Sequence, residues 1–200
     1  MNSRAARPST NISAVEIREI AQLMSASEVE RTLIRLAHQI LEKNNGVDEL
    51  ALVGILRRGV PLAQRLGKII QRIEKKPVLL GTLDVTLYRD DLHRENLAAF
   101  GSQPPPPKSE MEIAIAGKSV VLVDDVLYTG RTTRAAMDAL FRFGRPRRLQ
   151  LCVLIDRGHR ELPIEAAFVG RAVQTTENQI IQVKLREVDD ADRVLLMEKQ

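Results

Sequence analysis

The apolar run VVLV, from Val120 to Val123, continues through two aspartates and a glycine directly into an amphipathic helical pattern. An uninterrupted apolar run is typical of a strand buried on both faces, as in a parallel sheet covered by helices. The same order appears at residues 49–73, where ELALVGIL precedes an apolar helical stripe that begins near Pro61. Strands and helices in alternation predict an α/β fold with a mostly parallel central sheet flanked by helices.

The rest of the chain supplies further predicted elements. A capping box at Ser27 and Glu30, followed by apolar residues at helical spacing, predicts a first helix that ends near Asn45. Residues 1–26 are predicted to form an N-terminal tail, and residues 27–200 a single domain. Additional strands are predicted at 78–87, 149–155, 167–170, 180–185 and 194–197, and a helix at 132–143.

One long polar segment interrupts this pattern at residues 89–112. It contains Gly101 and four consecutive prolines, Pro104 to Pro107. A loop of this length inside a compact domain is usually a functional lid or a disordered insert. Because polyproline is stiff, it can also serve only as a spacer. Both interpretations remain open.

Composition excludes several classes of protein. No apolar run approaches the roughly 20 residues that a membrane span needs, and the N-terminus lacks the apolar core of a secretory signal. The single cysteine, Cys152, lies in the apolar run LQLCVLI and cannot form an internal disulfide or a thiolate metal cluster. His38, His93 and His159 lack metal-ligand spacing, so no metal held by the protein alone is predicted. We expect a cytoplasmic protein that does not associate with membranes.

The charge balance is mildly basic, with a formal net charge of +4. Such a balance suits an anionic ligand or a nucleic acid, although it also occurs on ordinary solvated surfaces. Aromatic residues make up only 3% of the chain, which argues against an RNA platform built on base stacking.

The most distinctive chemistry follows the strand VVLV, and ligands of open α/β sheets collect beyond the carboxyl ends of the strands. A helix that starts in this segment offers unpaired N–H groups and the positive end of its dipole, which suit a phosphate. The segment supplies backbone, hydroxyl and charged donors from Thr129, Gly130, Arg131, Thr132 and Thr133.

Two carboxylates, Asp124 and Asp125, precede this phosphate loop. At a strand end they suit the 2′- and 3′-hydroxyls of a ribose, and they can stabilise positive charge that develops on the sugar ring. The alternative is that Thr132 or Thr133 merely caps the helix and that the aspartates are solvated. The segment is neither a Walker loop nor a dinucleotide fingerprint. On its own it predicts a site for a phosphorylated ribose.

The segment VVLVDDVLYTGRTT resembles the phosphoribosyl-pyrophosphate signature of the type I phosphoribosyltransferases. Together with TLYRDDL (86–92) and DRGHRELPI (156–164), it resembles the bifunctional pyrimidine-operon regulators that are also uracil phosphoribosyltransferases. The similarity extends from about Val29 to Val194. It implies the type I phosphoribosyltransferase fold, with a long flexible loop and a small hood region. It also implies the conversion of uracil and phosphoribosyl pyrophosphate (PRPP) to UMP and pyrophosphate.

The resemblance also implies roles for individual residues. Arg57, Arg58 and Gly59 match the pyrophosphate loop, with an Arg57–Arg58 link that is strained or cis; a plain basic turn is the alternative. The loop that holds Arg89 is expected to fold over the substrate. The catalytic residues are expected to be Asp124, Asp125, Arg58 and Arg89. The residues expected to bind PRPP or nucleotide are Arg57, Arg58, Gly59, Asp124, Asp125, Val126, Leu127, Tyr128, Thr129, Gly130, Arg131, Thr132, Thr133 and Arg157.

The base and the metal are expected to be bound differently. Uracil is expected to contact Arg157 and backbone groups at Gln179, Ile180 and Ile181. Mg²⁺ is expected to be bound mainly by pyrophosphate oxygens, ribose hydroxyls and water. Another base, such as hypoxanthine, remains an alternative substrate.

Regulatory members of the resembled subfamily bind messenger RNA as dimers and respond to uridine nucleotides, which implies a homodimer or a larger assembly here. Ile34 stands where RNA-binding members carry threonine, and Glu165 stands where they carry arginine. Either the RNA surface is altered, or regulation is weaker or absent; a regulator that only senses nucleotide is a further alternative. The candidate RNA contacts, which a solvated surface would also explain, are Arg31, Arg35, His38, Lys43, Arg160 and Arg171.

Overall fold

A computed structural model describes residues 17–86 and 114–200 of the chain. Its central sheet has five parallel strands in the order β3-β2-β4-β5-β6. The middle strands are almost fully buried, as their continuous apolar sequences predict. The strands are β2 (Leu50–Ile55), β3 (Leu79–Leu83), β4 (Ser119–Leu127), β5 (Arg148–Asp156) and β6 (Phe168–Ala172).

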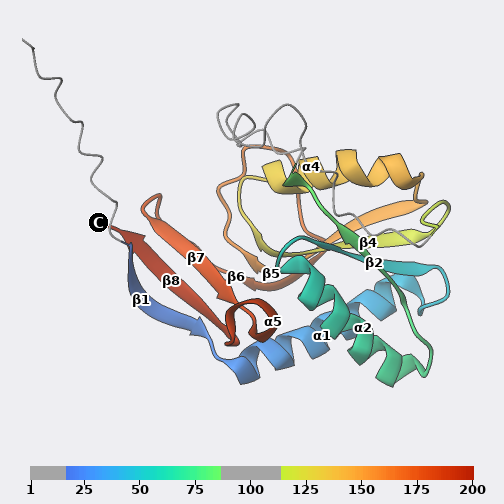
Figure 1. Ribbon diagram of the computed structural model, residues 1–200, viewed down its shortest axis with the longest axis horizontal. Helices are drawn as coiled ribbons and strands as arrows, with labels where there is room; N and C mark the ends of the chain where they lie inside the picture. The colour runs from blue at the N-terminus through green and yellow to red at the C-terminus, as the bar shows by residue number, and fades with distance from the viewer. Residues whose placement is uncertain (1–16, 87–113) are drawn as a thin grey trace, which may run out of the picture.

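Helices cover both faces of this sheet, and each face has its own apolar core. Helices α1 (Ala26–Asn44) and α2 (Gly59–Glu74) pack on one face, over a cluster that includes Leu36, Leu66 and Cys152. Helix α4 (Arg131–Leu140), extended by a 3₁₀ turn at Phe141–Phe143, covers the other face. Figure 1 shows α4 on one side of the sheet and α1 and α2 on the opposite side. The predicted α/β fold is confirmed.

A second, smaller sheet forms the predicted hood. It consists of antiparallel strands in the order β1-β8-β7 and lies beside the central sheet (Figure 1). The short helix α5 (Arg186–Asp189) connects β7 (Gln179–Lys184) to β8 (Arg193–Lys199). The remaining strand, β1 (Ile17–Met24), comes from the N-terminal part of the chain.

The prediction of a tail over residues 1–26 was therefore wrong for residues 17–24, which pair with β8. These residues are largely exposed and carry no strong apolar periodicity, so their strand conformation depends on a partner far along the chain. Residues 1–16 lie outside the described part. The prediction of a single domain over residues 27–200 stays a prediction.

Helix α1 begins two residues earlier than expected. Its capping box is Ser25 with Glu28: the backbone N–H of Ser25 donates to Glu28 Oε2 at 2.8 Å, and the Ser25 hydroxyl donates to the same oxygen at 2.7 Å. The sequence also contains the pair Ser27 and Glu30, and pattern alone did not choose between the two registers. The helix ends as predicted, with Asn45 in the left-handed conformation.

The long polar loop predicted at residues 89–112, including Arg89, lies outside the described residues. Strand β3 ends at Leu83, four residues before the predicted end. Strand β4 is longer than predicted and runs through Asp124 and Asp125 to Leu127. Within the described ranges, no helix has the length and apolarity to cross a membrane.

Candidate active site

The Arg57–Gly59 loop, the acidic pair and the DRGHRELPI segment lie at the ends of three strands. These strands, β2, β4 and β5, are neighbours in one parallel sheet. Their carboxyl ends therefore share one edge, where a ligand site is expected. The backbone N–H of Arg157, just after β5, donates to the carbonyl of Leu127 at the end of β4 at 2.9 Å. The structure thus joins segments that are separated in the sequence.

The acidic pair occupies the last residues of β4, where its side chains are fixed by the backbone. Asp124 is buried, and its Oδ1 accepts the N–H of Asp125 at 2.9 Å. Asp125 is partly exposed, and its Oδ1 accepts the N–H of Val126 at 2.9 Å. Burial raises the pKa of Asp125, while a hydrogen bond with Asp124 and the charge of Arg58 act in the opposite direction. A ligand that donates hydroxyl groups or brings positive charge would stabilise this carboxylate.

The phosphate loop leads from β4 into α4. Gly130 is the N-cap residue of the helix, in the left-handed conformation with φ 91°, a conformation that disfavours residues with a Cβ. Neither Thr132 nor Thr133 caps the helix, so the alternative interpretation of these threonines is wrong. The Arg131 guanidinium pairs with Glu161 at 2.6 Å. The start of α4 therefore provides N–H groups and hydroxyls, while Arg131 is held at the rim.

A second loop follows β2, as predicted. The cis peptide bond lies at Leu56–Arg57, one bond earlier than the predicted Arg57–Arg58. The sequence motif identifies the loop but does not show which of its peptide bonds is cis. A Cβ on Gly59 would lie 2.2 Å from the carbonyl oxygen of Val123 in β4. Only glycine allows the start of α2 to lie this close to β4. The two loops are therefore in backbone contact.

Arg58, the N-cap residue of α2, is paired with a carboxylate of the hood. Its Nε and one Nη donate to Asp189 of α5 at 3.0 and 2.7 Å, and Asp125 contributes a favourable charge interaction. The hydrogen bond with Asp189 raises the pKa of Arg58, although burial opposes this effect, and it lowers the pKa of Asp189. Asp189 was missed from the sequence, because its partner is 131 residues away.

Arg157 connects the third strand end to the hood. It is buried, with 8% of its surface exposed, and its guanidinium lies 3.8 Å from the centroid of the Tyr128 ring. Its Nε donates to the hydroxyl of Thr175 at 2.9 Å, and an Nη donates to the carbonyl of Gln179 at 2.5 Å. Thr175 was not predicted, since a lone threonine in a polar turn carries no signal. Arg157 thus contacts the start of the segment proposed to bind the base.

The rest of that segment belongs to β7. Ile181 is 8% exposed and packs in the core, so its side chain cannot reach a ligand. Gln179 Oε1 accepts the N–H of Thr176 at 3.1 Å, which orders the turn before β7. The carbonyl oxygen of the Gln179 side chain is therefore engaged within the turn, and contact of a base with the backbone of this segment stays a prediction.

Arg160 does not lie on an open surface, contrary to its proposed place on an RNA face. Its guanidinium forms two 2.7 Å hydrogen bonds with the carboxylate of Asp156. It also donates to the carbonyls of Tyr128 at 2.9 Å and Gly158 at 3.0 Å. Arg160 therefore holds the phosphate loop and the DRGHRELPI turn together, a role that the sequence alone did not distinguish from RNA binding.

Three of the other predicted RNA contacts line one groove. Arg31, Arg35 and Arg171 surround a volume of about 300 Å³ between α1 and β6, together with Glu28. Arg35 donates to the carbonyl of Gly170 at 2.5 Å, and Arg171 donates to the carbonyl of Leu23. Both side chains remain exposed. We call this the basic groove.

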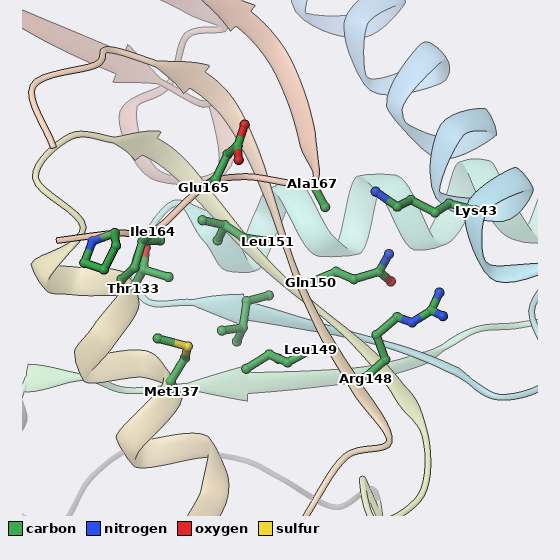
Figure 2. Close-up of a pocket in the computed structure, with 12 residues that line it drawn as sticks. Lys43, Thr133, Met137, Arg148, Leu149, Gln150, Leu151, Ile164, Glu165 and Ala167 are labelled. Atoms are coloured by element: carbon green, nitrogen blue, oxygen red, sulfur yellow. The ribbon is translucent and has the colours of Figure 1, made fainter.

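A larger groove of about 610 Å³ lies beside the start of β5, between α4 and residues 163–167 (Figure 2). Lys43 and Glu165 lie on its border, so Lys43 is separated from the basic groove. Gln150 lines the groove but is 7% exposed, and neither polar atom of its carboxamide has a hydrogen-bond partner among the described residues.

Comparisons with known proteins agree with this geometry. Residues 19–187 match the model of the phosphoribosyl transferase domain family. The bifunctional protein PyrR of Thermus aquaticus is 54% identical over 180 residues, which cover 90% of this chain and 97% of that protein. The bifunctional protein PyrR of Clostridium acetobutylicum is 49% identical over 178 residues, covering 89% and 97%.

Solved structures give the same fold at low sequence identity. The hypoxanthine phosphoribosyltransferase of Trypanosoma cruzi has a TM-score of 0.67 at 17% identity and covers 91% of this chain and 98% of its own. A hypoxanthine-guanine phosphoribosyltransferase of Bacillus anthracis has a TM-score of 0.64 at 20% identity, covering 91% and 99%. The acidic pair, the phosphate loop and these matches lead to one conclusion: the chain belongs to the phosphoribosyltransferase family and, within it, to the bifunctional PyrR proteins.

Proposed function

We propose that this protein transfers ribosyl phosphate from PRPP to uracil, giving UMP and pyrophosphate, and that it also binds messenger RNA to regulate pyrimidine biosynthesis. One observation carries the enzymatic part: Asp124 and Asp125 end strand β4 where the chain leads into α4, and the Arg58 loop follows the neighbouring strand β2. This arrangement offers a carboxylate for the ribose, a cation for the pyrophosphate and helix N–H groups for the 5′-phosphate.

The chemistry requires no protein nucleophile. As pyrophosphate leaves C1 of the ribose, the sugar ring acquires positive charge, and the carboxylates of Asp124 and Asp125 stabilise it. Arg58 stabilises the negative charge on the leaving group. The base is held by backbone groups near Gln179, in the orientation that brings its nitrogen to C1. Arg89, which lies outside the described residues, is proposed to contact the pyrophosphate.

Mg²⁺ fits this site as a cation that arrives with the ligand. Among the described residues, no group of three or more His, Cys, Asp or Glu side chains could hold a metal ion. Asp124 and Asp125 supply hard oxygen atoms, but two carboxylates are too few for a protein cage. Bound through pyrophosphate oxygens, ribose hydroxyls and water, the ion would neutralise charge on the leaving group.

The enzymatic proposal is tested by incubating the protein with PRPP, Mg²⁺ and uracil and measuring UMP. Asp125→Asn is expected to lower kcat by roughly 10²- to 10³-fold, the usual cost of losing a group that stabilises transition-state charge. Parallel reactions with hypoxanthine and other bases test base identity. Absence of UMP from protein that binds PRPP would leave the alternative of a nucleotide sensor, and product only from another base would reassign the acceptor.

The basic groove supports the RNA-binding part of the proposal. Arg31, Arg35 and Arg171 lie close enough to contact consecutive phosphates, and His38 is exposed on the same helix. Ile34, 41% exposed, provides no hydrogen bond to RNA. Glu165 lies in the other groove, away from these arginines. Glu165 therefore adds no negative charge to the basic groove.

Gel shifts at several salt concentrations, with and without UMP, test RNA binding to a pyrimidine-operon leader transcript. Arg31→Ala and Arg171→Ala are each expected to weaken binding and to reduce the slope of log affinity against log salt by about 1. Lys68→Ala, an exposed change on α2, is the control. Unchanged affinity in both arginine variants would mean that this face is simply solvated.

We propose further that the protein is a homodimer or a larger assembly. We also propose that it is cytoplasmic, like the nucleotides that it uses. Phe141 and Phe143 are 53% and 41% exposed at the end of α4, and such aromatic side chains are commonly buried between subunits. Light scattering coupled to gel filtration would measure the assembly, and Phe141→Ser is expected to shift it towards the monomer.

A further inference from the structure

The ion pair between Arg58 and Asp189 joins the pyrophosphate loop to the hood. Arg58 uses one edge of its guanidinium, Nε and one Nη, to grip both oxygens of Asp189 at 3.0 and 2.7 Å. Both side chains are partly buried, with exposures of 30% and 17%. A two-pronged contact of this kind fixes the plane of the guanidinium as well as its position.

Asp189 is itself held firmly. Its Oδ2 also accepts the backbone N–H of Leu185 at 3.0 Å, and its own N–H donates to the carbonyl of Leu185 at 2.7 Å. Leu185 is completely buried in the core beneath the hood. The carboxylate is therefore a fixed point against which the long, flexible side chain of Arg58 is oriented.

The opposite edge of the guanidinium remains for a ligand. Among the hydrogen bonds of the described residues, Arg58 uses Nε and one Nη for Asp189, which leaves its second Nη to donate to a phosphate oxygen. Arg58 follows β2, the neighbour of the strand that carries the acidic pair, and the charge of Asp125 favours its cationic form. Without Asp189, a freely rotating arginine would lose side-chain entropy each time a ligand bound.

We propose that Asp189 is a positioning residue: it orients Arg58 towards the pyrophosphate of PRPP and connects Arg58 to the hood. The inference rests on the proposed function of this site and adds a residue that acts only through Arg58. Because α5 directly follows β7, the same contact connects the pyrophosphate loop to the strand that carries the proposed base segment. Because Asp189 contacts Arg58 directly and the base segment only through the chain, loss of Asp189 should affect PRPP more than uracil.

The molecule contains a matched control for this experiment. Arg65, two helical turns along α2, forms a similar two-pronged pair with Glu187 of α5 at 2.8 and 2.5 Å. Glu187 joins the same two helices as Asp189 but does not contact Arg58. Glu187→Gln thus removes one ion pair between α2 and the hood while leaving Arg58 and Asp189 in place; Arg65 keeps its second pair, with Asp192 at 2.6 Å.

Steady-state kinetics with uracil and PRPP test the proposal. Asp189→Asn is expected to raise the KM for PRPP about tenfold, the effect of one charge-assisted hydrogen bond, with kcat and the KM for uracil changed less than threefold. Asp189→Glu, which retains the carboxylate, should recover part of the loss. Glu187→Gln should leave the KM for PRPP unchanged. An unchanged KM for PRPP in Asp189→Asn, or an equal rise in Glu187→Gln, would overturn the proposal.

Calorimetric titration of each variant with PRPP and Mg²⁺ separates this proposal from the proposed function. If the wild type binds PRPP but makes no UMP, the proposed function fails, whereas a tenfold weaker Kd in Asp189→Asn still supports positioning. A Kd equal to that of the wild type would contradict it. If Asp189→Asn does not fold, Asp189→Ser and Asp189→Glu are titrated in its place, with the same criteria.

Discussion

Arg157 lies over the ring of Tyr128, with its guanidinium carbon 3.8 Å from the ring centroid. The pair brings the end of β5 onto the phosphate loop of β4. It also orders the arginine that donates to Gln179, at the start of the proposed base segment. We infer that Tyr128 acts on base binding through Arg157, by a cation–π contact.

Replacing Tyr128 tests this contact. Tyr128→Leu removes the aromatic face and is expected to raise the KM for uracil about fivefold, since an arginine–aromatic contact contributes about 1 kcal/mol. Tyr128→Phe keeps the face and should resemble the wild type. Equal effects of the two changes would assign the role to the hydroxyl group instead.

Arg160 is expected to stabilise the folded protein. Arg160→Ala removes a two-pronged ion pair with Asp156 and leaves loop carbonyls without a donor, so unfolding free energy should fall by about 2 kcal/mol. The melting temperature should fall by about 4–8 °C. Arg134→Ala is the control, because its pair with Asp138 is exposed and 3.7 Å long, and should change stability by less than about 0.5 kcal/mol. Similar losses in both variants would contradict the structural role of Arg160.

Replacing Gln150 with an apolar residue is expected to stabilise the protein. Its buried carboxamide has no partner among the described residues, and such a group typically costs about 1–3 kcal/mol. Gln150→Leu has similar volume and removes the unpaired atoms, so it should raise the free energy of unfolding by at least about 1 kcal/mol in urea denaturation. Gln182→Leu, an exposed change on β7, should give no such gain. A loss of stability in Gln150→Leu would indicate that the carboxamide is satisfied in solution.

The contact between α2 and the hood should weaken in acid. Hydrogen bonds from Arg58 and Arg65 lower the pKa of Asp189 and Glu187 in the folded protein. Stability from a lowered carboxyl pKa is complete above the unfolded pKa, about 4, and is lost as pH falls through the folded value. The hydrogen-exchange protection factors of β7 and α5 amides, which correct exchange rates for the pH dependence of intrinsic exchange, should fall below about pH 4. In Arg65→Met this fall should be smaller, and wild-type protection factors that stay constant between pH 6 and pH 3 would contradict this account.

The parts of the site that sequence predicted are those formed by consecutive residues. Asp124, Asp125 and Gly130 belong to one strand–loop–helix unit, whose order alone indicates a ribose phosphate site. Asp189 could not be predicted in the same way, because its role depends on a contact with Arg58 made by the folding of two separate sheets. The exposure of Arg160 could not be predicted either. The sequence shows a basic residue and does not show that its guanidinium is used inside the fold.

The pairing of Arg58 with Asp189 has an electrostatic consequence for ligand choice. Because Arg58 is paired with Asp189 and also interacts with the charge of Asp125, much of its positive charge is already compensated before a ligand binds. A bare polyphosphate would meet Asp124 and Asp125 with little compensating charge, whereas a polyphosphate already paired with a divalent cation would not. We propose that the carboxylates near Arg58 disfavour the uncomplexed anion, so that the site accepts its polyphosphate substrate more readily as a complex with a divalent cation.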